Sequence, residues 1–248
     1  MPAALSINLN KVALLRNSRG RDVPSLLEYV DRSIAAGAQG ITLHPRLDQR
    51  HVRFDDVPGV AAHLAEHHPG VELNIECEDD EGLLDLVCKV QPSQCTLVPV
   101  TPGEVTSDHG WSLPVDADRL RRAIDRLKDQ GIRTSGFVDC NPEPMAAFAE
   151  LGIDRVELYT GPYAWAWSPD QPSPETERVW ATAAAARAVG LGLNAGHDLD
   201  RHNLVDLREI PELAEVSIGH AVICRALELG LAVAVGELRQ ALDPTWSP

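Results

Sequence analysis

A short apolar run followed by a longer amphipathic stretch recurs eight times along this chain of 248 residues. Such an alternation of strand and helix patterns requires parallel strands that are joined by right-handed crossovers. Eight units in this length predict an α/β fold, a closed (β/α)8 TIM barrel with extra short helices. An open, doubly wound sheet is the alternative. The predicted strands cover residues 5–10, 41–43, 71–75, 95–98, 133–138, 155–159, 192–195 and 215–218.

Amphipathic patterns place helices between these strands, and no linker rich in Gly, Pro or Ser divides the chain. We therefore expect a single domain over residues 1–248. The segments 11–20 and 162–174 are expected to be loops. The predicted helices cover residues 22–36, 55–68, 81–90, 115–130, 142–151, 175–189, 204–210 and 221–242, the last as one or two helices.

The charge and the cysteines of the chain exclude several classes of protein. A net charge of −15 argues against binding to nucleic acid or to an anionic membrane surface, both of which require basic patches. The five cysteines are widely spaced and form no Cys-x-x-Cys pair, so we expect reduced thiols in a cytoplasmic protein. Residues 1–10 lack the features of a signal peptide, and no apolar run is long enough to predict a membrane span.

Polar side chains follow nearly every predicted strand. In barrels of this type the active site lies at the carboxyl ends of the strands. Each group alone is more simply a structural residue, but buried ionisable groups are costly unless they are used or paired. Their accumulation at one end therefore predicts an acid–base site. The strand ends carry Asn8, Asn10, His44, Glu76, Thr101, Asp139, Glu157, His197 and His220.

Two places in the sequence are typical of phosphate-binding sites. Gly196 and Gly219 precede helices after the seventh and eighth strands, where barrels bind phosphate with backbone N–H groups. The alternative is that both glycines only permit tight turns. The second place is the group Arg46, Arg50 and His51. The alternative is that these side chains are only solvated at the protein surface and bind no phosphate. Arg16 and Arg19 are possible helpers of this second group.

No metal site or dinucleotide fingerprint is predicted. His197 and His202, with Asp198 and Asp200 between them, match no standard spacing of metal ligands. Trp165 and Trp167 are expected to pack against the protein, with a lid over the site as the alternative. Cys140 follows a strand, but we expect it to be an inert thiol.

Taken together, the motifs at the strand ends resemble the pyridoxine 5'-phosphate synthase family of the deoxyxylulose-dependent vitamin B6 route. The resemblance runs from about residue 5 to residue 240. It implies a transferase that condenses 1-deoxy-D-xylulose 5-phosphate with 3-amino-2-oxopropyl phosphate. The products would be pyridoxine 5'-phosphate, inorganic phosphate and water. The motifs are Asn8-Leu9-Asn10, residues 15–20, residues 40–46, Arg50-His51, Asn74-Ile75-Glu76, residues 97–99, Glu104-Val105-Thr106, residues 194–197, His202-Asn203 and residues 218–221.

The resemblance also implies roles for individual residues, no cofactor, no metal, and a homo-octamer or another homo-oligomer. His44 and Glu76 would accept protons, His197 would donate one, and Glu157 would be a further acid–base or orienting group. Two sets of residues would bind the phosphorylated substrates. The sugar phosphate would be held by Arg46, His51 and Thr106, and the amino-ketone phosphate by Asn8, Arg19, Gly219 and His220.

Several positions depart from the pattern of that family. Asn10 and Lys11 stand where the family has Asp-His, and Asp198 stands where it has glycine; all three are expected to contact substrate. Tyr159 replaces a histidine, and residues 100–102 also differ. These departures leave two alternatives open. One is a condensing enzyme or lyase that uses the same acid–base core on another amino ketone or sugar phosphate, and the other is a barrel that binds phosphometabolites without catalysis.

Overall fold

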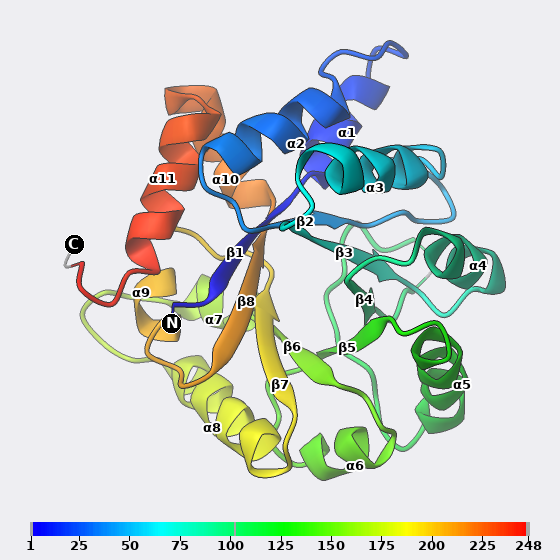
Figure 1. Cartoon of the computed structure of the whole chain (residues 1–248). Coiled ribbons are helices and arrows are strands. Elements are labelled where there is room, and N and C mark those ends of the chain that lie inside the picture. Colours follow the sequence, from blue (N-terminus) through cyan, green and yellow to red (C-terminus); the bar gives the residue numbers. More distant parts are fainter. Residues whose placement is uncertain (1, 102, 247–248) are drawn as a thin grey trace.

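The computed structural model describes residues 2–101 and 103–246. Its eight parallel strands close into a barrel in sequence order, with β8 paired to β1 (Figure 1). The prediction of a closed (β/α)8 barrel is therefore confirmed, and the open sheet is excluded. The strands are β1 (Ala4–Asn8), β2 (Gly40–Leu43), β3 (Glu72–Cys77), β4 (Gln94–Leu97), β5 (Arg133–Val138), β6 (Arg155–Tyr159), β7 (Gly192–Gly196) and β8 (Leu213–Ile218).

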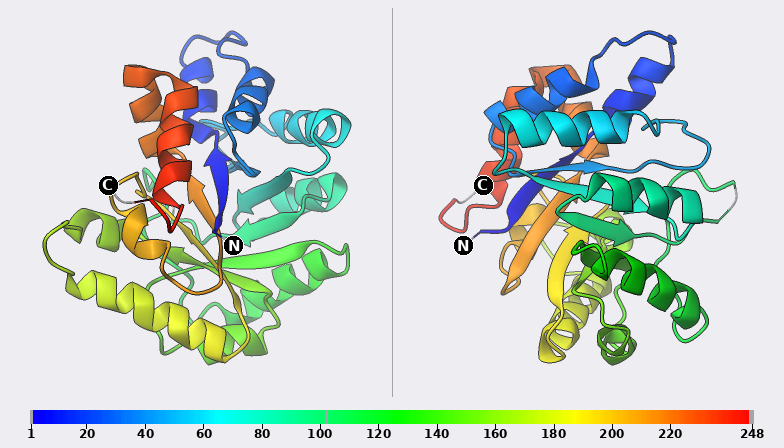
Figure 2. Two further views of the ribbon diagram at one scale, coloured as in Figure 1. Left: turned by 60° about the vertical axis from the view of Figure 1, so that its left-hand side comes forward. Right: turned by 45° about the vertical axis from the view of Figure 1, so that its right-hand side comes forward.

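The helices surround the barrel, and α11 packs beside α2 to close the outer layer (Figures 1 and 2). The predicted closing segment forms two helices, which are separated at Gly230 with φ +83°. The helices are α1 (Asn10–Asn17), α2 (Leu26–Ala35), α3 (Asp56–His67), α4 (Glu81–Val90), α5 (Ala117–Lys128), α6 (Met145–Glu150), α7 (Gly161–Ala166), α8 (Pro174–Ala188), α9 (Leu204–Leu207), α10 (His220–Leu229) and α11 (Leu231–Ala241).

The segment 11–20 was wrongly expected to be a loop, because α1 occupies most of it. The strand before it ends at Asn8, whose Oδ1 accepts a hydrogen bond of 3.0 Å from the N–H of Asn10. Val12 and Ala13 are then buried beneath the helix. Asn10 consequently lies in the first turn of α1 and not on the same strand as Asn8.

The segment 162–174 was also wrongly expected to be only a loop, because it contains α7. Tyr163 anchors this helix: its ring is buried, and its hydroxyl donates a hydrogen bond of 2.6 Å to the carbonyl of Asn203. The indole N–H of Trp167 donates to Asp206, and the ring packs against the core, as expected. Trp165 is different, since it is 68% exposed.

The side chains that point into the barrel are unusually polar. Alternation along each strand turns Leu5 and Ile7 toward the helices, whereas the intervening Ser6 faces the interior and lies 2.6 Å from Thr42. Thr96 likewise donates a hydrogen bond of 3.1 Å to Asn74. The same alternation brings His44, Glu76 and Glu157 to the interior near the carboxyl ends of their strands. The fold thus delivers the ionisable residues to one end of the barrel.

Among residues 2–101 and 103–246, no helix has both the length and the apolar character needed to cross a bilayer.

Candidate active site

A cavity of about 560 Å³ lies at the carboxyl ends of the strands. Its volume falls in the range typical of small-molecule sites, which is about 300–1,000 Å³. All residues that the resemblance or the departures from it assigned to catalysis or substrate binding line this cavity, except Arg19. These residues are Asn8, Asn10, Lys11, His44, Arg46, His51, Glu76, Thr106, Glu157, His197, Asp198, Gly219 and His220.

His44 and Glu76 form a pair on one side of the cavity. Nδ1 of His44 lies 3.3 Å from Oε2 of Glu76, and the amide group of Asn8 donates to the same carboxylate oxygen at 3.3 Å. Asn10 fixes the main chain at His44, because its Oδ1 accepts a hydrogen bond of 2.9 Å from the N–H of His44. Nε2 of His44 is buried without a partner in the described residues. This nitrogen is therefore free to exchange a proton with a substrate.

Glu157 lies at the floor of the cavity and is fully buried. Burial, together with the charges of Glu76 and Glu215, raises the pKa of its carboxyl group well above the usual range. The side chain accepts a hydrogen bond of 3.3 Å from Thr96. This shift favours the protonated form of Glu157, which can serve as an acid.

His197 is held on the opposite side by contacts to both of its ring nitrogens. Nε2 lies 3.0 Å from the hydroxyl of Thr106, and Nδ1 lies 3.2 Å from Oδ2 of Asp198. The indole N–H of Trp165 donates to this same Oδ2 at 2.8 Å. Hydrogen bonding to His197, and then to Trp165, lowers the pKa of Asp198 against the opposing effect of burial. An ionised Asp198 therefore supports and orients His197, and it also lines the cavity, where a substrate contact was expected of it.

The turn that carries His197 has an unusual backbone. His197 and Asp198 adopt φ values of +88° and +56°, a region that few residues other than glycine enter. The hydroxyl of Thr160 donates to the carbonyl of His197 at 2.7 Å, and the amide group of Asn203 donates to that of Asp198 at 3.1 Å. Strain held in place by such contacts is typical of functional sites.

Arg46, Arg50 and His51 form a basic side of the cavity. The guanidinium of Arg46 is paired with Glu104 at 2.8 Å, and Arg50 donates to the carbonyls of Glu104 and Val105. These contacts connect the loop after β2 to the loop after β4. The sequence analysis gave Glu104 no role, because its partner Arg46 lies 58 residues away.

His51 is a neutral hydrogen-bond donor in this cluster. Burial first, and then the charges of His44, Arg50 and Arg46, lower its pKa to about 3. Its Nδ1 accepts a hydrogen bond of 3.0 Å from the N–H of Val52, which leaves the proton on Nε2. A neutral imidazole in this tautomer can donate Nε2–H to a phosphate oxygen.

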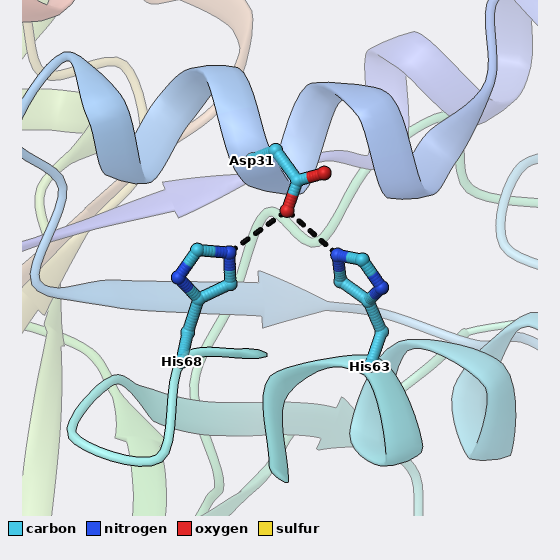
Figure 3. Close-up of side chains that lie close together, drawn as sticks. All are labelled: Asp31, His63 and His68. Atoms are coloured by element: carbon cyan, nitrogen blue, oxygen red, sulfur yellow. Dashed lines mark hydrogen bonds and ion pairs between the residues drawn. The ribbon is translucent and has the colours of Figure 1, made fainter. Parts of the chain in front are cut away.

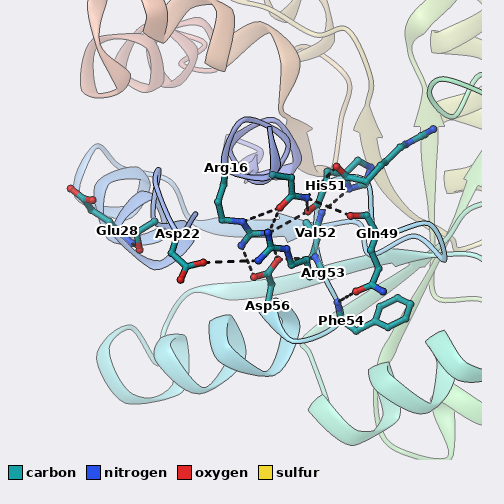
Figure 4. A network of polar contacts seen from close by, with 12 residues as sticks. Arg16, Asp22, Glu28, Gln49, His51, Val52, Arg53, Phe54 and Asp56 are labelled. Carbon is teal, nitrogen blue, oxygen red and sulfur yellow. Dashed lines mark hydrogen bonds and ion pairs between the residues drawn. The ribbon is translucent and has the colours of Figure 1, made fainter. Parts of the chain in front are cut away.

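Arg16 was wrongly expected to help bind phosphate. It is buried and forms a bidentate ion pair with Asp56, with N···O distances of 2.6 and 2.8 Å (Figure 4). Its guanidinium also reaches the carbonyl of His51 at 3.4 Å, and Asn17 donates to that carbonyl at 2.7 Å. Arg16 therefore positions the main chain of His51. Arg19 lies in the exposed turn after α1 and does not line the cavity.

Two other strand ends support the loops and do not line the cavity. The side chain of Asp139 accepts a hydrogen bond of 2.9 Å from the N–H of Gly110, and the N–H of Thr101 donates to Glu104 at 3.0 Å. Burial raises the pKa of Cys140 to about 12, which agrees with an inert thiol. The expected ring of acid–base groups is thus smaller than the sequence indicated.

At the end of β8, Gly219 precedes α10 and lies against Asn8. A β-carbon on residue 219 would approach the side chain and carbonyl of Asn8 to 3.1 Å. Gly219 and the first residues of α10, His220 and Ala221, line the cavity. Such a helix start favours an anion.

Comparisons with known proteins identify the family of the chain. The family model of the pyridoxal phosphate biosynthesis protein PdxJ matches residues 5–244. A pyridoxine 5'-phosphate synthase of Mesorhizobium japonicum is 48% identical over 97% of this chain and 99% of its own length. One of Albidiferax ferrireducens is 48% identical over 95% of both chains.

Solved structures with low sequence identity show the same fold. The tryptophan synthase A-subunit of Pyrococcus furiosus superposes with a TM-score of 0.66 at 13% identity, over 96% of this chain and 97% of the other. A phosphoribosyl anthranilate isomerase of Thermotoga maritima gives a TM-score of 0.61 at 14% identity, over 97% and 98%. The sequence matches are the more specific evidence, and by them the chain belongs to the family of the pyridoxal phosphate biosynthesis protein PdxJ.

Proposed function

We propose that this chain is a pyridoxine 5'-phosphate synthase. It condenses 1-deoxy-D-xylulose 5-phosphate with 3-amino-2-oxopropyl phosphate, closes the ring and releases inorganic phosphate. The family match and the full-length identity of 48% support this reaction. The observation that carries the mechanism is one cavity enclosing His44 paired with Glu76, the buried Glu157 and the supported His197.

Two phosphorylated substrates need two anion sites, and the cavity offers them on different walls. Arg46, His51 and Thr106 are suited to the phosphate of the sugar. Asn8, Gly219 and His220, at the start of α10, are suited to the phosphate of the amino ketone. Because Arg46 is paired with Glu104, the sugar phosphate would have to compete with this carboxylate. The two anions would hold the amine of one substrate close to the carbonyl of the other.

The reaction moves several protons. Imine formation removes a proton from the amine and protonates the departing hydroxyl, and phosphate elimination and ring closure move further protons. His44, with Glu76 behind it, is suited to accept protons. Glu157 and His197 are suited to donate them, since burial favours the protonated form of Glu157 and a carboxylate lies beside His197. General acid–base groups of this kind typically contribute about 10²- to 10⁴-fold each.

The departures from the family pattern are compatible with this chemistry. Asn10 accepts a hydrogen bond from the N–H of His44, a contact that an aspartate can also make. Asp198 contacts His197, and the ring of Tyr159 lies edge-on to His197, with centroids 5.1 Å apart. Lys11 adds a positive charge to the wall next to Asn10. These residues support the catalytic groups and do not block the cavity.

We further propose a cytoplasmic homo-oligomer. Leu14 and Leu15 on α1 and Leu227 on α10 are 43%, 55% and 79% exposed, and contacts between subunits would cover such side chains. The free thiols support a reducing compartment. Light scattering should give a multiple of the chain mass of 26.9 kDa. A monomer would contradict this part of the proposal.

Incubation of the pure chain with both substrates tests the proposed reaction. Pyridoxine 5'-phosphate and inorganic phosphate should form in equal amounts, and neither should form when one substrate is omitted. Absence of product from a folded chain would contradict the proposal. In that event, the double substitution Asn10→Asp with Lys11→His would show whether these departures redirect the enzyme to another substrate pair.

A further inference from the structure

Three metal-binding side chains converge on the outside of the barrel, far from the cavity. Asp31 lies on α2, His63 lies on α3, and His68 directly follows α3 (Figure 3). Nε2 of His63 lies 2.6 Å from Oδ1 of Asp31, and Nε2 of His68 lies 2.8 Å from the same oxygen. Both imidazoles therefore point their outer nitrogens at one carboxylate oxygen.

The three donor atoms lie within 4.8 Å of one another. In a tetrahedral zinc site with bonds of about 2.0–2.1 Å, neighbouring ligand atoms are about 3.3 Å apart. The two N···O distances of 2.6 and 2.8 Å would lengthen by roughly 0.5–0.7 Å to reach that spacing around an ion. The Asp31 side chain is 49% exposed, so this change meets little resistance and leaves a position open to water.

The donor set selects a class of metal. Two imidazole nitrogens and one carboxylate oxygen suit Zn²⁺ and its neighbours among the transition metals. Mg²⁺ prefers oxygen ligands only, and so it does not match this set. The net charge of −15 adds a general attraction for cations.

We propose that Asp31, His63 and His68 form a binding site for a divalent transition metal such as Zn²⁺, which links α2 to α3. His68 lies at the end of α3 that precedes β3, at the opposite end of the barrel from the cavity. The bound ion would therefore stabilise the outer layer without taking part in the reaction. The sequence analysis expected no metal, because Asp31 and His63 are 32 residues apart and match no ligand spacing.

Thermal unfolding of the metal-free chain with added Zn²⁺ tests this site. At a Zn²⁺ concentration 100-fold above its Kd, the Tm should rise by roughly 5–10 °C, whereas Mg²⁺ should leave it unchanged. Calorimetry should give one Zn²⁺ per chain. His63→Ala and His68→Ala should each abolish the rise in Tm.

Two other histidine variants serve as matched controls. His109→Ala removes a histidine from the group Glu104, Asp108 and His109, whose donor atoms also lie close together, and should retain Zn²⁺ binding. His67→Ala should retain it too, since Nε2 of His67 lies 3.9 Å from Glu66 and outside the proposed set. Absence of Zn²⁺ binding, or its loss in either control, would overturn the proposal.

A spectroscopic measurement on the unmodified chain does not depend on how the variants fold. Co²⁺ in place of Zn²⁺ should give the intense visible absorption of a four-coordinate ion. The weak absorption of an octahedral ion would contradict the assigned set.

Discussion

A β-carbon on residue 196 would lie 2.3 Å from Oε1 of Glu157, so the carboxyl group of Glu157 occupies space that only glycine leaves free. Gly196 was interpreted from the sequence as part of a phosphate-binding turn or of a tight turn. The structure gives it another role, because its missing side chain makes room for a buried acid.

Gly196→Ala should therefore displace Glu157. We expect a loss of about 1–3 kcal/mol in the free energy of unfolding, as for other overpacked sites, and a large drop in turnover. The control is Gly59→Ala in α3, where a β-carbon would meet no atom within 4 Å. That change should stabilise the chain by up to about 1 kcal/mol. Full activity of Gly196→Ala would show that Glu157 need not occupy its observed position.

Glu157→Gln tests the protonated carboxyl group. At neutral pH the amide resembles the protonated acid in size and charge, so we expect the fold and its stability to change little. Turnover should fall by about 10²- to 10⁴-fold, because an amide cannot transfer the proton. Denaturant unfolding and steady-state kinetics at pH 7 measure the two effects. Retained turnover would make Glu157 a structural residue only.

Asp198→Asn tests the support of His197. The substitution removes the carboxylate that lies 3.2 Å from Nδ1 of the imidazole proposed to donate a proton. We expect kcat to fall by about 10- to 100-fold, because His197 loses a contact that orients its ring. Trp165→Phe removes one hydrogen bond and keeps the charge, so its effect should be smaller. An unchanged kcat in Asp198→Asn would contradict the proposed support of His197.

Glu215, at the amino-terminal end of the barrel interior, makes stability depend on pH. Burial, with the charge of Glu72 adding to it, raises its pKa from 4.5 to about 7. Between these values the folded chain keeps a proton that the unfolded chain has released, so the free energy of unfolding falls as the pH rises. The fall is complete above pH 7.

Glu215→Gln removes this dependence. Relative to the native chain, the variant should gain up to about 3 kcal/mol between pH 4.5 and pH 8. Urea unfolding across this range measures the gain, and the exposed Glu209→Gln is the control. A constant difference between variant and native chain at all pH values would show that Glu215 titrates normally.

The periodic features of the fold could be predicted from the sequence, because alternation of strands and helices is a local signal. The same pattern indicated which strand ends face the cavity, and so it found His44, Glu76, Glu157 and His197. Helix α1 was not found, because much of what stabilises it comes from burial of Val12 and Ala13 against the barrel.

Contacts between distant segments could not be predicted. Arg16 was interpreted as a possible helper in phosphate binding, because its partner, Asp56, lies 40 residues away. The contact from Trp165 to Asp198, which spans 33 residues, was not predicted either. Pairings of this kind depend on how the loops fold over the barrel. A local sequence pattern does not predict this arrangement.

The proposal that the cavity performs acid–base chemistry is tested most directly by the rate of phosphate release from the two substrates in His44→Gln. Nε2 of His44 is free while Nδ1 contacts Glu76, so glutamine should keep the fold and lose the base. We predict a rate about 10²- to 10⁴-fold below that of the native chain, with His202→Gln, outside the cavity, unchanged. Equal rates for His44→Gln and the native chain would contradict the proposed role of His44.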